Sequence, residues 1–286
     1  MIVQHNMTAL NANRQLGVSN SSLAKSTEKL SSGYRINRAA DDAAGLSISE
    51  KMRGQIRGLN QASDNAQNGI SLIQTAEGAL NEVHSVLQRM RELAVQGAND
   101  TNVTKDRQAI NSEMKALADE IGRIGKETEF NTMKLFSSEG NGIGGSPKAL
   151  QVGANQGQTI SFTMAKIGGS SGSGIKIDGT EVISTANLTA SSNATYGAAV
   201  TAINDAIEKL SAKRSDLGAL QNRLEHTIAN ADNTSENLQS AESRIRDVDM
   251  ADEMVKYSKS SILQQAGQSM LAQANQSTQG VLSLLR

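Results

Sequence analysis

The strongest constraint on this sequence is the absence of charge at both of its ends. No Asp, Glu, Lys or Arg occurs from Met1 to Asn13, and none occurs from Ser260 to Leu285. Both segments are patterned as helices, and a helix whose polar residues are only Gln, Ser and Asn is poorly solvated on its own. We therefore expect the two ends to become buried together, in an assembly or in a membrane.

The rest of the sequence favours the assembly. No stretch approaches the roughly 20 apolar residues that a helix needs to cross a bilayer, and the last segment carries several glutamines. The beginning of the chain has no basic region followed by an apolar run, so we expect no cleavable signal peptide. A net charge of −1 and an aromatic content of 2% give no basis for binding nucleic acid or anionic lipid.

Long helices are permitted because the chain contains one Pro, and the absence of Cys excludes disulfides and thiol chemistry. Leu80 and Leu87 belong to a seven-residue repeat within the second of the predicted helices. A short turn follows that helix, which predicts that the third helix packs antiparallel to it. The last segment places its apolar residues, including Leu271, on one broad face. The predicted helices are 6–32, 43–97, 103–128, 196–244 and 250–285.

The middle of the chain is rich in Gly and Ser and lacks a helical period. Short apolar or alternating runs predict strands in hairpins, with a tight turn at Asp178-Gly179. The run GGSSGSG at 168–174 is predicted to be a flexible exposed loop. The predicted strands are 149–152, 159–164, 175–177 and 181–183.

Long, ordered motifs in both halves of the chain resemble bacterial flagellins. The first half contains KLSSGYRINRAADDAAGLSISEKMRGQIRG at 29–58, and the second contains SSILQQAGQSMLAQANQ at 260–276. The resemblance covers about 1–166 and 196–286. Only 167–195 stands where many flagellins carry large outer domains, so the chain is similar to a short-form flagellin of the Gram-positive type. Further matching motifs are 68–96, 128–136, 217–230 and 241–254.

The resemblance agrees with the fold class that the periodicity predicts. That class is mainly α: a long antiparallel helical bundle with terminal coiled-coil helices and a small β-hairpin region in the middle. The resemblance divides the chain into five parts. They are an N-terminal inner-core helix (1–40), an outer-core bundle of two long helices and a β-hairpin (41–166), a short exposed variable segment (167–195), a long C-terminal bundle helix (196–244) and a C-terminal inner-core helix (245–286).

The function that the resemblance implies is that of a structural subunit, which self-assembles into the flagellar filament for motility. It would be exported unfolded through the flagellar type III system to the extracellular flagellum. Implied partners are further copies of the chain, an export chaperone at the C-terminal helix, and the filament cap and hook-junction proteins. The alternatives are a hook–filament junction protein and a secreted helical module that does not polymerise.

The resemblance also assigns roles to particular residues. Recognition by the innate immune flagellin receptor would involve Arg89, Leu93 and Glu113. O-glycans on the outer surface would lie at Ser170, Ser171 and Ser173. The residues expected to pack the inner core on polymerisation are Leu16, Leu23, Leu30, Ile262, Leu263, Met270, Leu271 and Leu285.

No group of residues suggests catalysis. The acidic pair Asp41-Asp42 and the acidic cluster at 247–253 are interpreted as helix caps and solvated faces, because no His, Cys or Gly-rich loop accompanies them. The three histidines are isolated from one another, and none has a second ligand four residues away. We therefore expect no enzymatic activity, no cofactor and no metal.

Overall fold

The computed structural model describes residues 6–137, 142–170, 174–177, 180–184 and 192–284, and within these ranges it is mainly helical. The chain forms two compact units. The terminal unit combines residues 1–56 with 236–286, and the central unit comprises 57–235. Five helices and seven short strands occur in the described ranges, and the two long helices α2 and α4 contribute residues to both units.

The helix boundaries lie close to the predicted ones because recognisable capping residues mark them. α1 spans Met7–Ser32; the Asn6 side chain accepts a hydrogen bond from the Ala9 N–H at 3.0 Å, and Gly33 ends the helix with a φ of 75°. α2 spans Ala43–Gly97, and the Asp42 carboxylate accepts from the Gly45 N–H at 2.8 Å. The capping role predicted for Asp42 is therefore confirmed.

The remaining helices are α3 (Thr104–Glu127), α4 (Asn193–Arg246) and α5 (Met250–Leu284). α4 begins three residues before the predicted start, where Ser192 and Thr195 exchange side-chain and backbone hydrogen bonds. α5 begins after Asp249, whose carboxylate accepts from the N–H groups of Ala251 and Asp252. This geometry confirms that Asp249 acts as a cap.

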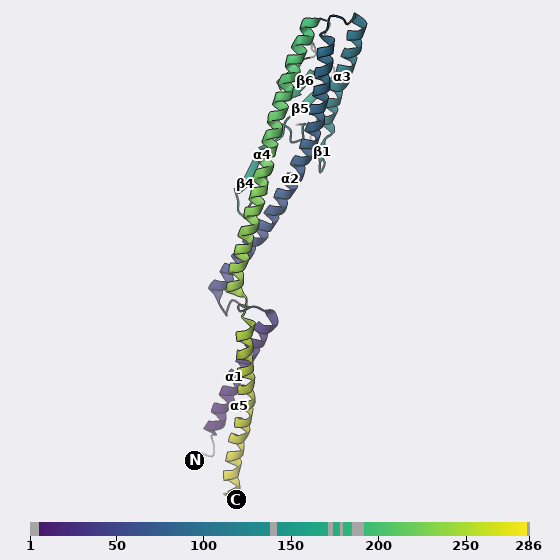
Figure 1. The fold of residues 1–286 in the computed structure, drawn as a ribbon. Helices are drawn as coiled ribbons and strands as arrows, with labels where there is room; N and C mark the ends of the chain where they lie inside the picture. The colour runs from purple at the N-terminus through teal and green to yellow at the C-terminus, as the bar shows by residue number, and fades with distance from the viewer. Residues whose placement is uncertain (1–5, 138–141, 171–173, 178–179, 185–191, 285–286) are drawn as a thin grey trace. The chain divides into compact units, whose positions relative to one another are not determined.

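The core of the central unit lies where α2, α3 and α4 run side by side (Figure 1). The seven-residue repeat of α2 supplies this core, since Leu80 and Leu87 are fully buried. Near the turn between α2 and α3, the Tyr196 ring of α4 is buried and its hydroxyl donates to Asn111 Oδ1 at 2.8 Å. The other large, fully buried side chains in this core include Ile73, Met90, Met114, Ile121 and Phe136.

The strands form three small antiparallel sheets, all in the central unit. β1 (Glu129–Phe130) pairs with β2 (Met133–Lys134), and β3 (Pro147–Gln151) pairs with β4 (Thr159–Thr163). The third sheet has the order β5-β6-β7, formed by Ile167–Ser170, Gly174–Ile177 and Thr180–Ile183. The mainly α fold with small strand pairs is therefore confirmed.

One prediction for the middle of the chain is wrong. Gly168 and Gly169, predicted to lie in a flexible loop, belong to β5 and pair with Lys176 and Ile175 of β6. β5 packs against α3, where Gly125 lies so close that an added Cβ would be 2.6 Å from the Ile167 carbonyl oxygen. A glycine-rich sequence can therefore form a strand here because a glycine of the neighbouring helix makes room for it. The predicted turn at 178–179 lies outside the described residues.

The same sheet corrects the expectation that 167–195 is an exposed segment. Ile175, Ile177 and Ile183 are at most 2% exposed and belong to the hydrophobic core. The physical reason is that β5 and β6 pack against α3, which helps to remove these isoleucine side chains from water.

Candidate assembly surface

The two terminal helices of the chain pack along each other in the terminal unit (Figure 1). On α1 the half-buried positions include Leu16, Leu23 and Leu30, which are spaced seven residues apart. On α5, Gly267 and Leu271 belong to the contacting face, and a Cβ at Gly267 would lie 3.4 Å from Leu16 Cδ1. The leucines at heptad spacing on α1 therefore lie at the contact between the two helices.

Polar or small residues form much of the contact between α1 and α5. Glu253 of α5 is only 3% exposed, and its carboxylate accepts hydrogen bonds from Ser26 Oγ at 2.7 Å and from Lys256 Nζ at 3.0 Å. Burial raises the pKa of Glu253, but these two hydrogen bonds and the charges of Lys256 and Lys29 together outweigh it and hold the pKa below its ordinary value. The buried carboxylate is therefore charged and paired at neutral pH.

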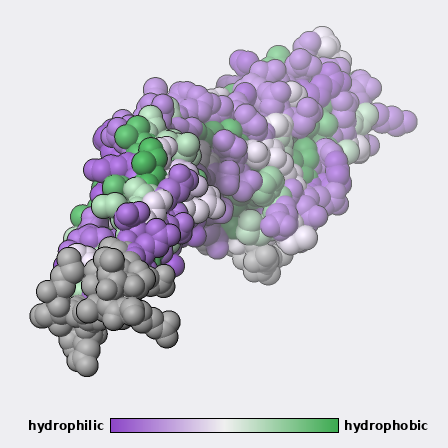
Figure 2. All heavy atoms as spheres, turned by 90° about the horizontal axis from the view of Figure 1, so that it is seen from below, coloured by the Kyte–Doolittle hydropathy of each residue, from purple (hydrophilic) through white to green (hydrophobic). Residues whose placement is uncertain are grey.

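The large apolar side chains of α5 mostly point away from α1. The outer stripe, as we name it, consists of Val255, Ile262, Leu263 and Met270, whose side chains are 49–69% exposed. The prediction of one broad apolar face that includes Leu271 is therefore wrong. At 3.6 residues per turn, Leu271 faces α1 while Ile262 lies on the far side of the helix. Figure 2 shows hydrophobic surface beside the grey terminal residues.

Of the eight residues predicted to pack the inner core, Leu16, Leu23, Leu30 and Leu271 contribute to the α1–α5 contact. The remaining described members of that set are exposed members of the outer stripe. Leu285 lies outside the described residues. From Ile262 on, the stripe therefore offers an apolar surface on a segment that has no charged side chain between Ser260 and Leu285.

A polar clamp, centred on Arg246 at the end of α4, joins this helix to α2 and to the segment between α1 and α2. The Arg246 guanidinium lies 4.9 Å from the centroid of the Tyr34 ring and donates to Glu50 Oε1 at 2.6 Å. The Arg35 N–H donates to the Arg246 carbonyl at 2.7 Å, so the backbones of α4 and of that segment are also bonded. The hydrogen bond from Arg246 is the main reason why the pKa of Glu50 is lowered. Sequence reasoning missed this clamp, because its members are far apart in the chain.

The three residues assigned to immune recognition lie in the central unit but differ in exposure. Arg89 of α2 is paired with Glu113 of α3, with Nη2 and Oε1 at 2.9 Å, and also with Glu92 at 3.1 Å. Hydrogen bonds to Glu113 and then to Glu92 raise the pKa of Arg89. Leu93 is only 2% exposed. The structure therefore brings Arg89 and Glu113 together at the surface and places Leu93 beneath it.

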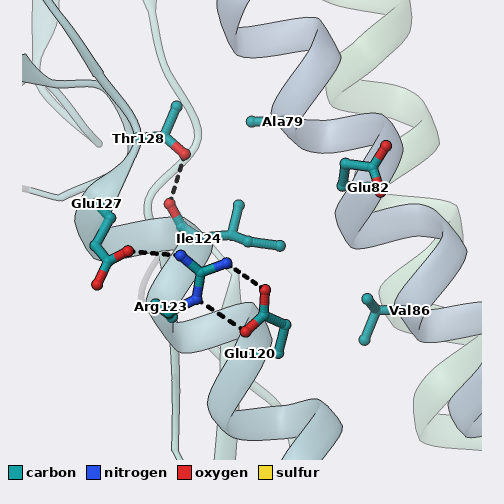
Figure 3. Close-up of a pocket in the computed structure, with 8 residues that line it drawn as sticks. All are labelled: Ala79, Glu82, Val86, Glu120, Arg123, Ile124, Glu127 and Thr128. Atoms are coloured by element: carbon teal, nitrogen blue, oxygen red, sulfur yellow. Dashed lines mark hydrogen bonds and ion pairs between the residues drawn. The ribbon is translucent and has the colours of Figure 1, made fainter.

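An open groove of about 530 Å³ lies between α2 and α3 in the central unit (Figure 3). Ala79, Glu82 and Val86 line one side, and α3 with Thr128 lines the other. The guanidinium of Arg123 bonds to Glu120 and to Glu127, with Nη1 and Oε2 of the latter pair 2.6 Å apart. Among the described residues, no three His, Cys, Asp or Glu side chains come together as metal ligands.

No helix in the described ranges combines the length and apolarity required to cross a membrane. Of the serines assigned to glycosylation, Ser170 ends β5, whereas Ser171 and Ser173 lie outside the described residues.

Comparison with known proteins gives consistent matches along the whole chain. Sequence models of the bacterial flagellin N-terminal and C-terminal helical regions match residues 3–141 and 200–285. A flagellin of Halalkalibacterium halodurans is 55% identical, and one of Bacillus subtilis is 50% identical, each match covering 100% of both chains. The structure of a putative flagellar hook-associated protein from Vibrio parahaemolyticus aligns with a TM-score of 0.59 at 17% identity. It covers 72% of this chain and 100% of that one, and at this identity it shows the fold alone.

The helical fold and these matches define a structural protein of the flagellar filament and not an enzyme. The chain belongs to the bacterial flagellin family, as the resemblance of its two ends predicts. Flagellins form the extracellular flagellar filament by associating with one another.

Proposed function

We propose that this filament subunit joins its neighbours by burying the outer stripe of α5. The observation that carries the proposal is that Ile262, Leu263 and Met270 are 49–67% exposed on a segment without charge. Exposed apolar residues grouped on one element mark interaction surfaces. The exposed residues of α1, which include Leu10 at 59% and Val18 at 56%, extend the apolar surface of the terminal unit.

The energetics support association through this surface. Full burial of one large aliphatic side chain stabilises an association by about 1.5–3 kcal/mol. In a polymer, every subunit contributes such a contact. Covering Ile262, Leu263 and Met270 desolvates no charged side chain within 260–285, so the usual cost of burying an ion is absent for this part of the stripe.

The test is the variant Leu263→Asp, which places an unpaired carboxylate in the stripe. Leu263 is 49% exposed within the subunit, so the helical content should change little while filament formation fails. The matched control Leu263→Met keeps the position apolar and should assemble. Circular dichroism of the monomer and electron microscopy after salting-out provide the two measurements. Normal filaments from Leu263→Asp would refute the proposal.

The same surface suggests how the subunit is handled before assembly. An export chaperone would cover the helix around 258–285, because an exposed, uncharged amphipathic helix is suited to a groove on a partner. Export by the type III route, and contacts with the filament cap and hook-junction proteins, belong to the same proposal. Calorimetric titration of the chaperone with the full chain and with a chain ending at Arg244 tests it; equal affinities would place the chaperone site elsewhere.

Recognition by the innate immune flagellin receptor is a second candidate role, favoured by the exposed Arg89–Glu113 pair. Because Leu93 is buried, we expect Arg89 and Glu113 to contact the receptor and Leu93 to support them from below. Arg89→Ala should therefore reduce receptor activation without changing the thermal stability much, since an exposed ion pair contributes about 0–1 kcal/mol. Leu93→Ala should reduce both receptor activation and thermal stability.

A further inference from the structure

The methionines of the described residues differ greatly in exposure. Met90, Met114 and Met164 are at most 1% exposed and belong to the core of the central unit. The exposed methionines all lie in the terminal unit, on α1 or α5, at 49–69% exposure: Met7, Met250, Met254 and Met270. The most exposed methionines are therefore gathered in the unit that carries the outer stripe.

Met270 differs from the other exposed methionines in its neighbours. It lies seven residues after Leu263, so the two side chains project from the same side of α5. It is 67% exposed, and it belongs to the segment without charge. Met254, sixteen residues earlier, lies on the opposite side of a helix with about 3.6 residues per turn. Met270 is therefore the member of the stripe whose polarity an oxidant can change.

We propose that Met270 is an oxidation site that controls the assembly of the free subunit, with a peroxide as the oxidant. The Met270 Sδ attacks one peroxide oxygen, the O–O bond breaks and an S–O bond forms. The sulfur loses two electrons, the peroxide gains them, and with hydrogen peroxide the second oxygen leaves as water. The product is methionine sulfoxide, which is polar and which methionine sulfoxide reductases convert back to the thioether.

The consequence follows from the burial of the stripe, so this inference rests on the proposed function. A sulfoxide oxygen is a strong hydrogen-bond acceptor, and burying it among apolar side chains without a donor is unfavourable. The α1–α5 contact does not use Met270, so the subunit itself should keep its structure. Oxidation would stop growth by free subunits, whereas Met270 in a completed filament would be covered and protected.

The experiment treats purified monomer with hydrogen peroxide and locates the added oxygen by peptide mass spectrometry. Met270 should be oxidised well before Met90, Met114 and Met164. Assembly is then measured by sedimentation. The oxidised subunit should require a concentration about ten-fold higher or more to assemble, because one buried apolar side chain is lost from the contact. Treatment with the reductases should restore assembly.

Two variants assign the effect to one sulfur. Met270→Leu keeps the stripe apolar but cannot be oxidised, so it should assemble equally well before and after peroxide. Met254→Leu is the matched control and should remain sensitive. Normal assembly of protein whose Met270 is fully oxidised, or loss of assembly by peroxide-treated Met270→Leu, would overturn the inference.

Failure of this inference can be distinguished from failure of the proposed function. If Leu263→Asp cannot assemble but oxidised Met270 has no effect, the contact stands and only the oxidation site is lost. If Leu263→Asp assembles normally, the contact itself is assigned wrongly. Protection of Met270 from peroxide in intact filaments, relative to monomers, supports the oxidation site and the contact together.

Discussion

At the scale of single residues, glycines decide where the helices of the central unit approach closely. Gly97 at the end of α2 lies against the buried Tyr196 ring, and a Cβ there would be 2.4 Å from its nearest ring carbon. Gly78, within the same helix, has no atom within 4 Å of its Cβ position. The two glycines therefore form a matched pair, in which one is required by packing and the other is not.

We expect Gly97→Ala to lower the free energy of unfolding by about 1–3 kcal/mol, because the methyl group forces a displacement of the Tyr196 ring. Gly78→Ala should raise it by about 0.5–1 kcal/mol, since Ala loses less conformational entropy in a helix. Urea unfolding followed by circular dichroism measures both. Equal effects of the two substitutions would contradict the packing described around Tyr196.

At the scale of elements, the pairing of α1 with α5 depends on a buried charge. Because the pKa of Glu253 is lowered in the folded state, its contribution to stability is present above the ordinary pKa of a glutamate, about 4.3. That contribution is lost as the pH falls through the lowered pKa of Glu253 in the folded state. The charges of Lys256 and, at longer range, of Lys29 also favour the ionised Glu253 carboxylate.

We therefore predict that α1–α5 pairing weakens as the pH falls below about 4, which is the range under the ordinary pKa of a glutamate. Hydrogen exchange of α1 and α5 amides should accelerate there in the unmodified protein. Glu253→Gln removes the titrating group, so its exchange rates should be higher at neutral pH and should change less between pH 6 and pH 3. Glu50 titrates in the same unit and is unchanged in both proteins, which makes the comparison specific. An unaltered pH profile in Glu253→Gln would refute the role of this carboxylate.

The elements also show what sequence reasoning can and cannot find. The repeat through Leu80 and Leu87 predicts α2 because seven-residue spacing and burial have the same cause. β5 escapes prediction because Gly168 and Gly169 carry no side chain that signals a strand, and pairing with β6 determines the structure. The clamp of Arg246 with Tyr34 also escapes it, since local patterns contain no information on contacts between distant residues.

At the scale of the whole molecule, the two units differ in how much apolar surface they bury. Among the described residues, Ile36 is the one buried hydrophobic residue of the terminal unit, whereas the central unit contains a continuous core. Regions with few buried apolar contacts open at low cost in free energy. The terminal unit should therefore open while the central unit remains folded.

Limited digestion of the monomer with trypsin tests this difference. Cleavage should occur first after Arg14, Lys25 or Lys29 of α1, and later after basic residues of α3 such as Lys115 and Arg123. A helical fragment containing most of 57–235 should accumulate. Filaments should resist cleavage of α1, because assembly covers the terminal unit. Simultaneous cleavage of α1 and α3 in a verified monomer would argue against separate stabilities.

The pairing of the chain's two ends also has a consequence for the order of folding. The Ser26–Glu253 hydrogen bond joins residues 227 positions apart, and the Asn6 side chain donates to the Ala274 carbonyl across 268 positions. Contacts between such distant residues require the closure of a long loop, so they form slowly and late unless the intervening chain has already folded. The central unit can bring the ends together first. A chain that is still incomplete therefore lacks the paired terminal unit, and we expect a subunit to become able to assemble only when its last residues have arrived.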